Sequence, residues 1–155
     1  MAKKNGFALT HIDPFLLELV HYTDHQTLAV WAIACTERVL PFFETVFPKD
    51  SRPRDALTTL QRWIETGAFS MAVIRGASLA AHAAAREVGE DTPARSAARA
   101  AGQAVATAHV PTHSLGAAMY ALQAIYRNSS PEEAESALAV EREWQLRRLN
   151  ELRGK

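Results

Sequence analysis

Alanine occupies 29 of the 155 positions of this chain and is concentrated between Ala77 and Ala124. It is the best helix former because its side chain loses no conformational entropy when the backbone becomes helical. Its small side chain also lets two helices approach to about 8 Å, the lower end of the usual interaxial range. Large apolar residues and cap residues interrupt this stretch regularly, which argues against a disordered low-complexity segment. We therefore predict an all-α protein with closely packed helices.

Residues typical of helix starts and stops divide the chain into about six to seven helices. Starts are predicted at six capping residues: Asp13, Asp24, Ser70, Thr92, Thr112 and Ser130. A further helix has Asp55 in its first turn and follows a loop over residues 48–54. Gly67 and Gly89 are the expected stops of two helices, because glycine readily adopts the left-handed backbone conformation. The short connections favour antiparallel neighbours, so we expect a single-domain multi-helix bundle or array over residues 1–155, with residues 1–12 frayed.

Two local features of the sequence make sharper predictions. The second helix has apolar residues at steps of three and four: Leu28, Trp31, Ala32, Cys35, Val39, Phe42 and Val46. Pro41 interrupts this series and would free the carbonyl of Glu37, so we expect a kink or a restart there. In the last helix we predict a capping box, because Glu133 lies three residues after Ser130.

The composition limits the classes of partner and the compartment. The formal charges balance, with 17 Lys and Arg against 17 Asp and Glu. Nucleic-acid-binding proteins usually carry an excess of basic residues, so we do not expect a nucleic-acid partner. No apolar run approaches the roughly 18–20 residues of a membrane span, and no apolar secretion segment follows the basic start. Cys35 is the single cysteine and has no internal disulfide partner. We expect a cytoplasmic protein that does not bind membranes.

Residues capable of catalysis or metal binding do not form a recognisable motif. His21 and His25 have the four-residue spacing that can begin a zinc site on one helix, and so do His109 and His113. Asp24 is a predicted helix cap and Pro111 a predicted helix end. The two histidines of each pair are therefore expected to lie on opposite sides of a helix boundary. There is no HExxH, CxxC, GxSxG or glycine-rich phosphate-binding pattern. We expect no enzymatic activity, no metal and no cofactor.

Five residues of the alanine-rich region are the candidate partner- or ligand-binding residues: His82, Arg86, Arg99, His109 and His113. His82 lies in mid-helix, and in an antiparallel arrangement it would face the middle of the next helix instead of reaching His109. A three-histidine site is therefore not implied. Arg95 and Arg99 share a helix face, where like charges repel unless an anion is close. That anion can be the acidic surface of a partner or one of the chain's own carboxylates.

Single glycines inside the predicted helices offer a further structural hypothesis. Gly76, Gly102 and Gly116 each stand alone within a helical stretch. Isolated helix glycines usually mark points where two helices come into close contact.

Seven short segments, taken in order, permit a comparison with known families. They are residues 28–32 (LAVWA), 37–41 (ERVLP), 50–54 (DSRPR), 80–86 (AAHAAAR), 97–102 (AARAAG), 108–118 and 141–145 (EREWQ). Together they resemble the Imm-five-like immunity proteins of bacterial polymorphic-toxin systems, over about residues 26–150. The resemblance implies an all-α protein that binds and neutralises a toxin made by the same bacterium, with no catalytic residues. Such a protein needs an exposed patch of roughly 800 Å² centred on a few aromatic or arginine anchors.

The sequence leaves open two alternatives to a toxin-neutralising function. The first is a small-ligand- or metal-binding helical protein that uses His82, His109 or His113 beside Arg86. The second is a helical homodimer with a structural role.

Overall fold

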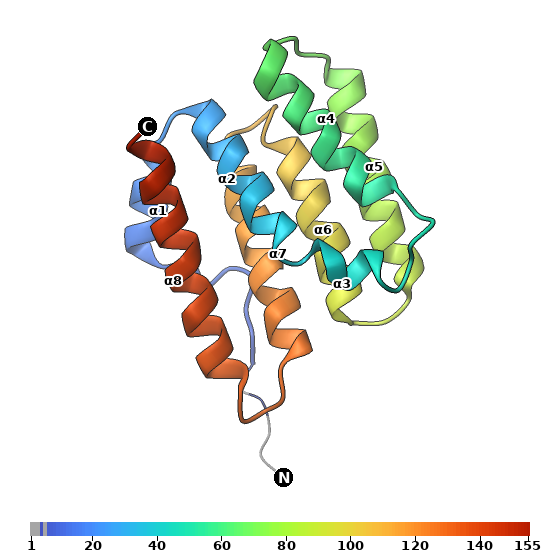
Figure 1. Ribbon diagram of the computed structural model, residues 1–155, viewed down its shortest axis with the longest axis vertical. Helices are drawn as coiled ribbons and strands as arrows, with labels where there is room; N and C mark the ends of the chain where they lie inside the picture. The colour runs from blue at the N-terminus through green and yellow to red at the C-terminus, as the bar shows by residue number, and fades with distance from the viewer. Residues whose placement is uncertain (1–3, 5) are drawn as a thin grey trace.

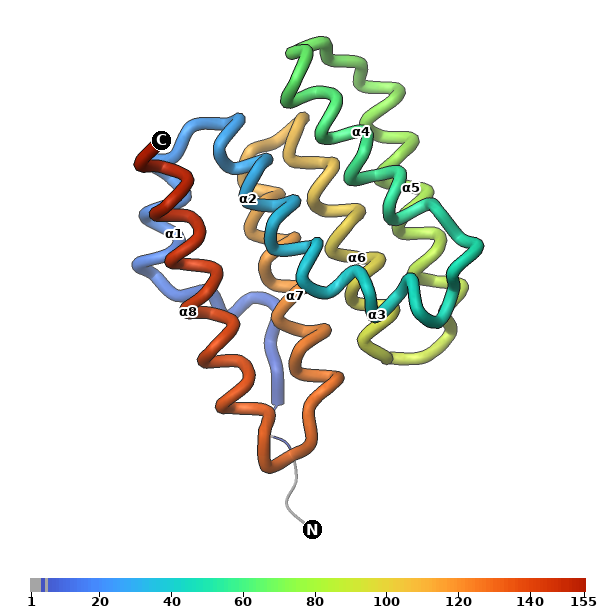
Figure 2. Tube along the Cα trace, in the orientation of Figure 1, coloured from blue at the N-terminus to red at the C-terminus, as the bar shows by residue number. Residues whose placement is uncertain are grey.

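The computed structural model describes residues 4 and 6–155 and has eight α-helices and no β-strand in this part of the chain (Figures 1 and 2). The helices are α1 Pro14–His21, α2 His25–Glu37, α3 Leu40–Glu44, α4 Arg52–Thr66, α5 Met71–Val88, α6 Pro93–Ala106, α7 His113–Asn128 and α8 Ala134–Arg153. The predicted all-α class is confirmed. The number of helices exceeds the six to seven predicted.

The additional helix arises at Pro41. Helix α2 ends at Glu37, and α3 begins at Leu40 with Pro41 in its first turn. Proline lacks a backbone N–H and fits the first turn of a helix, where that donor would have no partner. The expected restart therefore takes place and rotates the apolar face that follows. Phe43 is in the core, whereas Val46 is 61% exposed, so the prediction that the buried face of α2 continues to Val46 was wrong.

Three of the six predicted N-terminal caps form a side-chain hydrogen bond, whereas Thr92 and Thr112 precede α6 and α7 without one. The side chains of Asp13, Asp24 and Ser70 each accept a hydrogen bond from a backbone N–H in the first turn of the following helix. Gly67 and Gly89 end α4 and α5 with φ angles of 69° and 78°, in the left-handed region. These residues fix where the helices start and stop.

Two predicted boundaries were wrong in detail. The capping box at Ser130 is not formed, because residues 131–133 make a turn and α8 begins only at Ala134. The backbone carbonyl of Ser130 instead accepts hydrogen bonds from the N–H groups of Glu133 and Ala134. The loop predicted over residues 48–54 is shorter, since α4 begins at Arg52 with Pro53 in its first turn.

Helix α6 lies at the centre of the arrangement, between α5 and α7, and also contacts α2, α3 and α4 (Figure 1). Consecutive helices from α4 to α8 run antiparallel, as the short connections predicted (Figure 2). Helix α8 packs against α2 and α7. Helices α2, α3 and α4 therefore lie over one side of the α5–α6–α7 layer (Figure 1).

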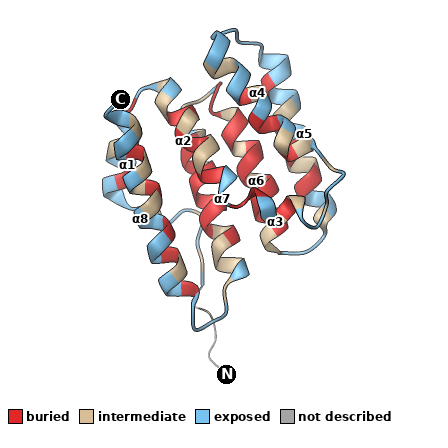
Figure 3. Cartoon of the chain, in the orientation of Figure 1, coloured by how far each residue is buried: buried red, intermediate tan, exposed pale blue. Residues whose placement is uncertain are grey.

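Small residues make this central position possible. Six alanines of α6 are almost completely buried: Ala94, Ala97, Ala98, Ala100, Ala101 and Ala104 (Figure 3). Alanine leaves little volume between helix axes, so several neighbours can approach the same helix closely. Trp31, Phe43 and Leu60 from the covering helices supply the larger side chains of the core.

The described residues before α1 pack on the helices but form no helix themselves. Phe7 stacks on Tyr126 with ring centroids 5.6 Å apart, and Lys4 Nζ donates a hydrogen bond of 2.8 Å to the Tyr126 carbonyl. Phe7, Leu9 and Ile12 lie against an apolar cluster of α7 and α8 made of Met119, Leu122 and Leu138. Of the residues expected to fray, 1–3 and 5 lie outside the described part of the chain.

Candidate functional site

The uncovered side of α6 is polar. Its partly exposed residues after the first turn recur at steps of three and four, namely Arg95, Arg99, Gln103 and Ala106, and so share one face of the helix. We define the outer face by these residues together with His82 and Arg86 of α5 and His113 and Arg127 of α7. Four of the five candidate binding residues are in this set.

His82 and Arg99 form the central contact of the outer face. Arg99 Nη1 lies 3.0 Å from His82 Nδ1. A guanidinium can only donate, so Nδ1 is the acceptor and the proton of the neutral ring is on Nε2. The ring lies directly over Gly102, where an added Cβ would come within 2.5 Å of Nε2. Helices α5 and α6 are therefore in close contact at this point, where the His82 ring packs against the backbone of Gly102.

The environment of His82 keeps its ring neutral at pH 7. Burial, followed by the charges of Arg99, Arg86 and His113 in that order, lowers the pKa of His82 to about 4. Arg99 contacts His82 directly, and Arg86 lies one helical turn after His82 on α5. The positive charge of this group therefore comes from its arginines.

A second contact of the same kind joins α6 to α7. His113 Nδ1 lies 2.9 Å from Gln103 Oε1, and since that oxygen can only accept, Nδ1 donates. The Gln103 side chain lies over Gly116, where an added Cβ would come within 2.5 Å of Oε1. Burial, followed by the charge of His109, lowers the pKa of His113. The expectation of close contact is thus confirmed for Gly102 and Gly116 but wrong for Gly76, which has no neighbouring atom within 4 Å.

His109 is the candidate that stands apart. It is exposed in the connection between α6 and α7, and its ring stacks on Phe69 with centroids 6.2 Å apart. His21 and His25 lie on separate helices, as predicted. In the part of the chain that the structure describes, no three His, Cys, Asp or Glu side chains are grouped so that they could hold a metal ion.

The arginines of the outer face fall into two pairs. Arg95 Nη1 lies 2.9 Å from Asp91 Oδ1, and Arg127 Nη2 lies 3.4 Å from the same oxygen. Arg86 and Arg99 form no ion pair with any carboxylate of the described residues. An internal carboxylate accounts for Arg95 and Arg127, whereas Arg86 and Arg99 have none.

Over residues 18–152 the chain matches the family described as Imm-5 like putative immunity protein. The chain belongs to this family. The resemblance indicated by the seven short segments is thereby confirmed. No curated protein and no solved structure matches the chain. Within the described residues, no helix is both long and apolar enough to span a membrane.

In this Imm-5 like protein, several residues of the resembling segments hold helices together in the interior. Trp31 Nε1 donates to the Gln145 carbonyl at 2.9 Å, and Gln145 Nε2 donates to the Ala118 carbonyl at 3.0 Å. Arg38 pairs with the buried carboxylate of Glu141. Sequence reasoning missed these contacts, because nothing in the pattern links residues so far apart. These contacts belong to the scaffold of the fold.

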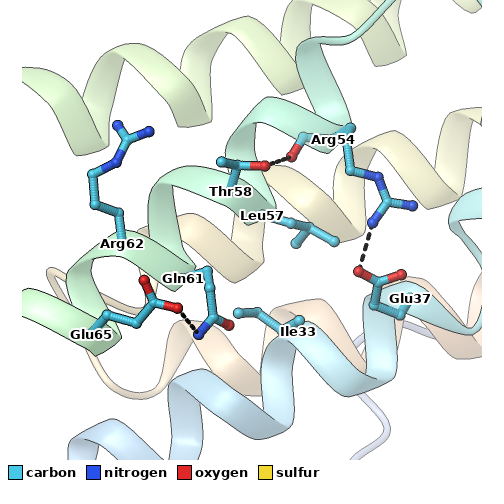
Figure 4. A pocket seen from close by; sticks show the side chains of 8 residues that line it. All are labelled: Ile33, Glu37, Arg54, Leu57, Thr58, Gln61, Arg62 and Glu65. Carbon is cyan, nitrogen blue, oxygen red and sulfur yellow. Dashed lines mark hydrogen bonds and ion pairs between the residues drawn. The ribbon is translucent and has the colours of Figure 1, made fainter.

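A pocket of about 320 Å³ between α2 and α4 is a second polar feature (Figure 4). Arg54 at its edge reaches Glu37 at 2.6 Å and Glu44 at 2.8 Å, and Gln61 donates to Glu65 at 3.2 Å. Two carboxylates therefore neutralise Arg54, whereas Arg62 forms no ion pair with the described residues. On the outer face of the Imm-5 like protein, Arg86 and Arg99 both lack a counter-ion among the described residues, and both lie near His82.

Proposed function

We propose that this protein is an immunity protein that binds a cognate bacterial toxin and neutralises it by direct protein–protein contact. Membership of the Imm-5 like family over residues 18–152 is the observation on which the proposal rests. Neutralisation by binding needs a stable scaffold and an exposed surface and requires no reaction centre. We place this activity in the bacterial cytoplasm, and we propose no enzymatic step.

The outer face is the surface that we propose for this contact. It presents Arg86, Arg99, His82 and His113, and His109 adds an exposed ring at its end near Phe69. Arginine is enriched among the residues that dominate binding energy at protein interfaces, because its planar guanidinium makes several directed hydrogen bonds. Three helices support these side chains, so the partner would meet a rigid surface and lose little free energy in ordering it.

Co-expression with the product of a neighbouring toxin-like gene tests the proposed function. The toxin alone should stop growth, and co-expression of this protein should restore it. Purified protein and a catalytically inactive toxin variant should form a stable complex in size-exclusion chromatography with light scattering. The same measurement on the free protein reports whether it is a monomer or a homodimer. Continued growth arrest despite abundant folded protein, or rescue without a complex, would contradict the proposal.

A further inference from the structure

We infer that the toxin partner presents a carboxylate-rich surface, and that Arg86 and Arg99 are the residues that anchor it. The inference rests on the proposed function and specifies the chemistry of its interface. It starts from a local imbalance of charge on a chain whose formal charges sum to zero.

The outer face has four arginines, and Asp91 is the one carboxylate of the described residues that pairs with any of them. The two other acidic residues near the end of α5 are directed elsewhere. Glu87 forms an ion pair with Arg52, and Glu90 lines an apolar groove together with Phe42 and Val46. No carboxylate of the described residues is therefore left to neutralise Arg86 and Arg99.

Arg99 is held in place for binding. Its Nη1 donates to His82 Nδ1, and the His82 ring is itself seated on Gly102. A guanidinium has five N–H donors in a planar fork, so the remaining donors can receive a carboxylate in a two-point contact. Because Arg99 is only partly exposed, solvent weakens its attraction to an anion less than it would at a fully exposed site.

Arg86 provides the second contact point. It is exposed and lies one helical turn after His82 on α5, while Arg99 contacts His82 from α6, so both arginines flank the same histidine. Two adjacent cations without counter-ions repel each other, and an incoming pair of carboxylates removes that repulsion while adding hydrogen bonds. His82 acts as a positioning residue between them.

A protein surface fits these observations better than a nucleic acid. Nucleic-acid binding draws its affinity from an extended set of basic residues that neutralises many phosphates. Here two unpaired arginines stand on a face whose other two are neutralised in part by Asp91, in a chain with 17 acidic residues. A few carboxylates on a complementary protein surface match that limited charge.

Isothermal titration calorimetry with the inactive toxin variant tests the inference. The double variant R86E/R99E should bind about 100-fold more weakly than the wild type, because each reversal replaces an attraction by a repulsion. Wild-type affinity should also fall as salt concentration rises. R62E is the matched control, since Arg62 is exposed on α4 beside the Figure 4 pocket, and it should bind like the wild type within about threefold.

The R86Q/R99Q variant guards against misfolding, because it removes both charges without introducing new ones. It should keep the wild-type circular dichroism spectrum and still lose most of the affinity. Wild-type binding combined with unchanged binding of both double variants would overturn the inference and leave the proposed function intact. Absence of wild-type binding would overturn the proposed function itself. Capture of a DNA or RNA oligonucleotide that depends on Arg86 and Arg99, without toxin binding, would replace the protein partner by a nucleic acid.

Discussion

Arg38 and Glu141 form a two-point ion pair across 103 residues of sequence, with Nε to Oε2 at 2.7 Å and Nη2 to Oε1 at 2.9 Å. The Glu141 residue is 4% exposed, whereas the Arg38 side chain is 38% exposed. The Arg38 guanidinium also lies 4.0 Å from the centroid of the Trp144 ring. This contact ties the end of α2 to the middle of α8.

The unequal burial of the two partners predicts unequal costs of removing them. R38A leaves a buried carboxylate without a counter-ion and should lower the free energy of unfolding by about 3 kcal/mol. E141Q leaves an arginine that can reach water and still stack on Trp144, so it should cost about 1 kcal/mol. Urea denaturation at neutral pH measures both values. A larger loss for E141Q than for R38A would show that the burial of Glu141 does not control this pair.

Two helix glycines should respond in opposite directions to an added methyl group. G76A should raise the free energy of unfolding by up to about 1 kcal/mol, because alanine favours the helix and Gly76 has no neighbour within 4 Å. G102A should lower it by about 1–2 kcal/mol, because the new Cβ would displace the His82 ring and strain its contact with Arg99. Thermal unfolding of the two variants under the same conditions measures the difference. If G76A and G102A raised the free energy of unfolding equally, the close packing of His82 on Gly102 would be contradicted.

The low pKa of His82 predicts a loss of stability in mild acid. The ordinary histidine pKa is 6.5, and burial followed by the charges of Arg99, Arg86 and His113 lowers the pKa of His82 in the folded protein to about 4, so the unfolded chain takes up this proton first as pH falls. The stabilising contribution of the neutral ring is therefore fully present above about pH 6.5 and is lost progressively between pH 6.5 and 4. The variant H82N keeps an acceptor near the position of Nδ1 but does not titrate in this range. The unfolding midpoint of the wild type should fall more steeply with decreasing pH than that of H82N, and parallel curves would contradict the assignment.

The capping residue Asp24 gives a test of the local helix signals. Its carboxylate accepts hydrogen bonds from the Thr27 N–H at 3.0 Å and the Thr27 hydroxyl at 2.6 Å, and these bonds lower the pKa of Asp24. D24A should therefore lower the free energy of unfolding by about 1 kcal/mol, whereas D24N keeps an acceptor and should lose only a few tenths. Chemical denaturation of the two variants separates the capping contribution from charge. If D24A and D24N lost the same free energy of unfolding, the charge of Asp24 and not its capping hydrogen bonds would be responsible for the stabilisation.

The success of the sequence-based predictions depended on the distance over which each signal acts. Asp13, Asp24, Ser70, Gly67 and Gly89 control backbone groups within a few residues of themselves, so their roles could be read from the sequence. The position of the restart at Pro41 was predictable for the same reason. The rotation that followed was not, because it depends on how α3 packs against α6, and this is why the burial of Val46 was mispredicted.

Four of the five candidate residues from the sequence lie on the outer face, but the sequence did not predict their contacts. His82 and Arg99 lie 17 residues apart on different helices, and their contact depends on how each helix is rotated about its own axis. Alanine-rich helices have similar surfaces on several sides, so the sequence alone defines that rotation poorly. For the same reason, the sequence could not separate Arg95 and Arg127, which share Asp91, from Arg86 and Arg99, which have no counter-ion.

Chemical-shift mapping by NMR would locate the partner on the surface without any substitution in this protein. The labelled protein is titrated with the inactive toxin variant, and backbone and arginine side-chain signals are followed. The largest changes should fall on the outer face, including the side-chain signals of Arg86 and Arg99, while α1 and the Figure 4 pocket stay unperturbed. Changes confined to α1, α4 or α8, with Arg86 and Arg99 unaffected, would contradict the account.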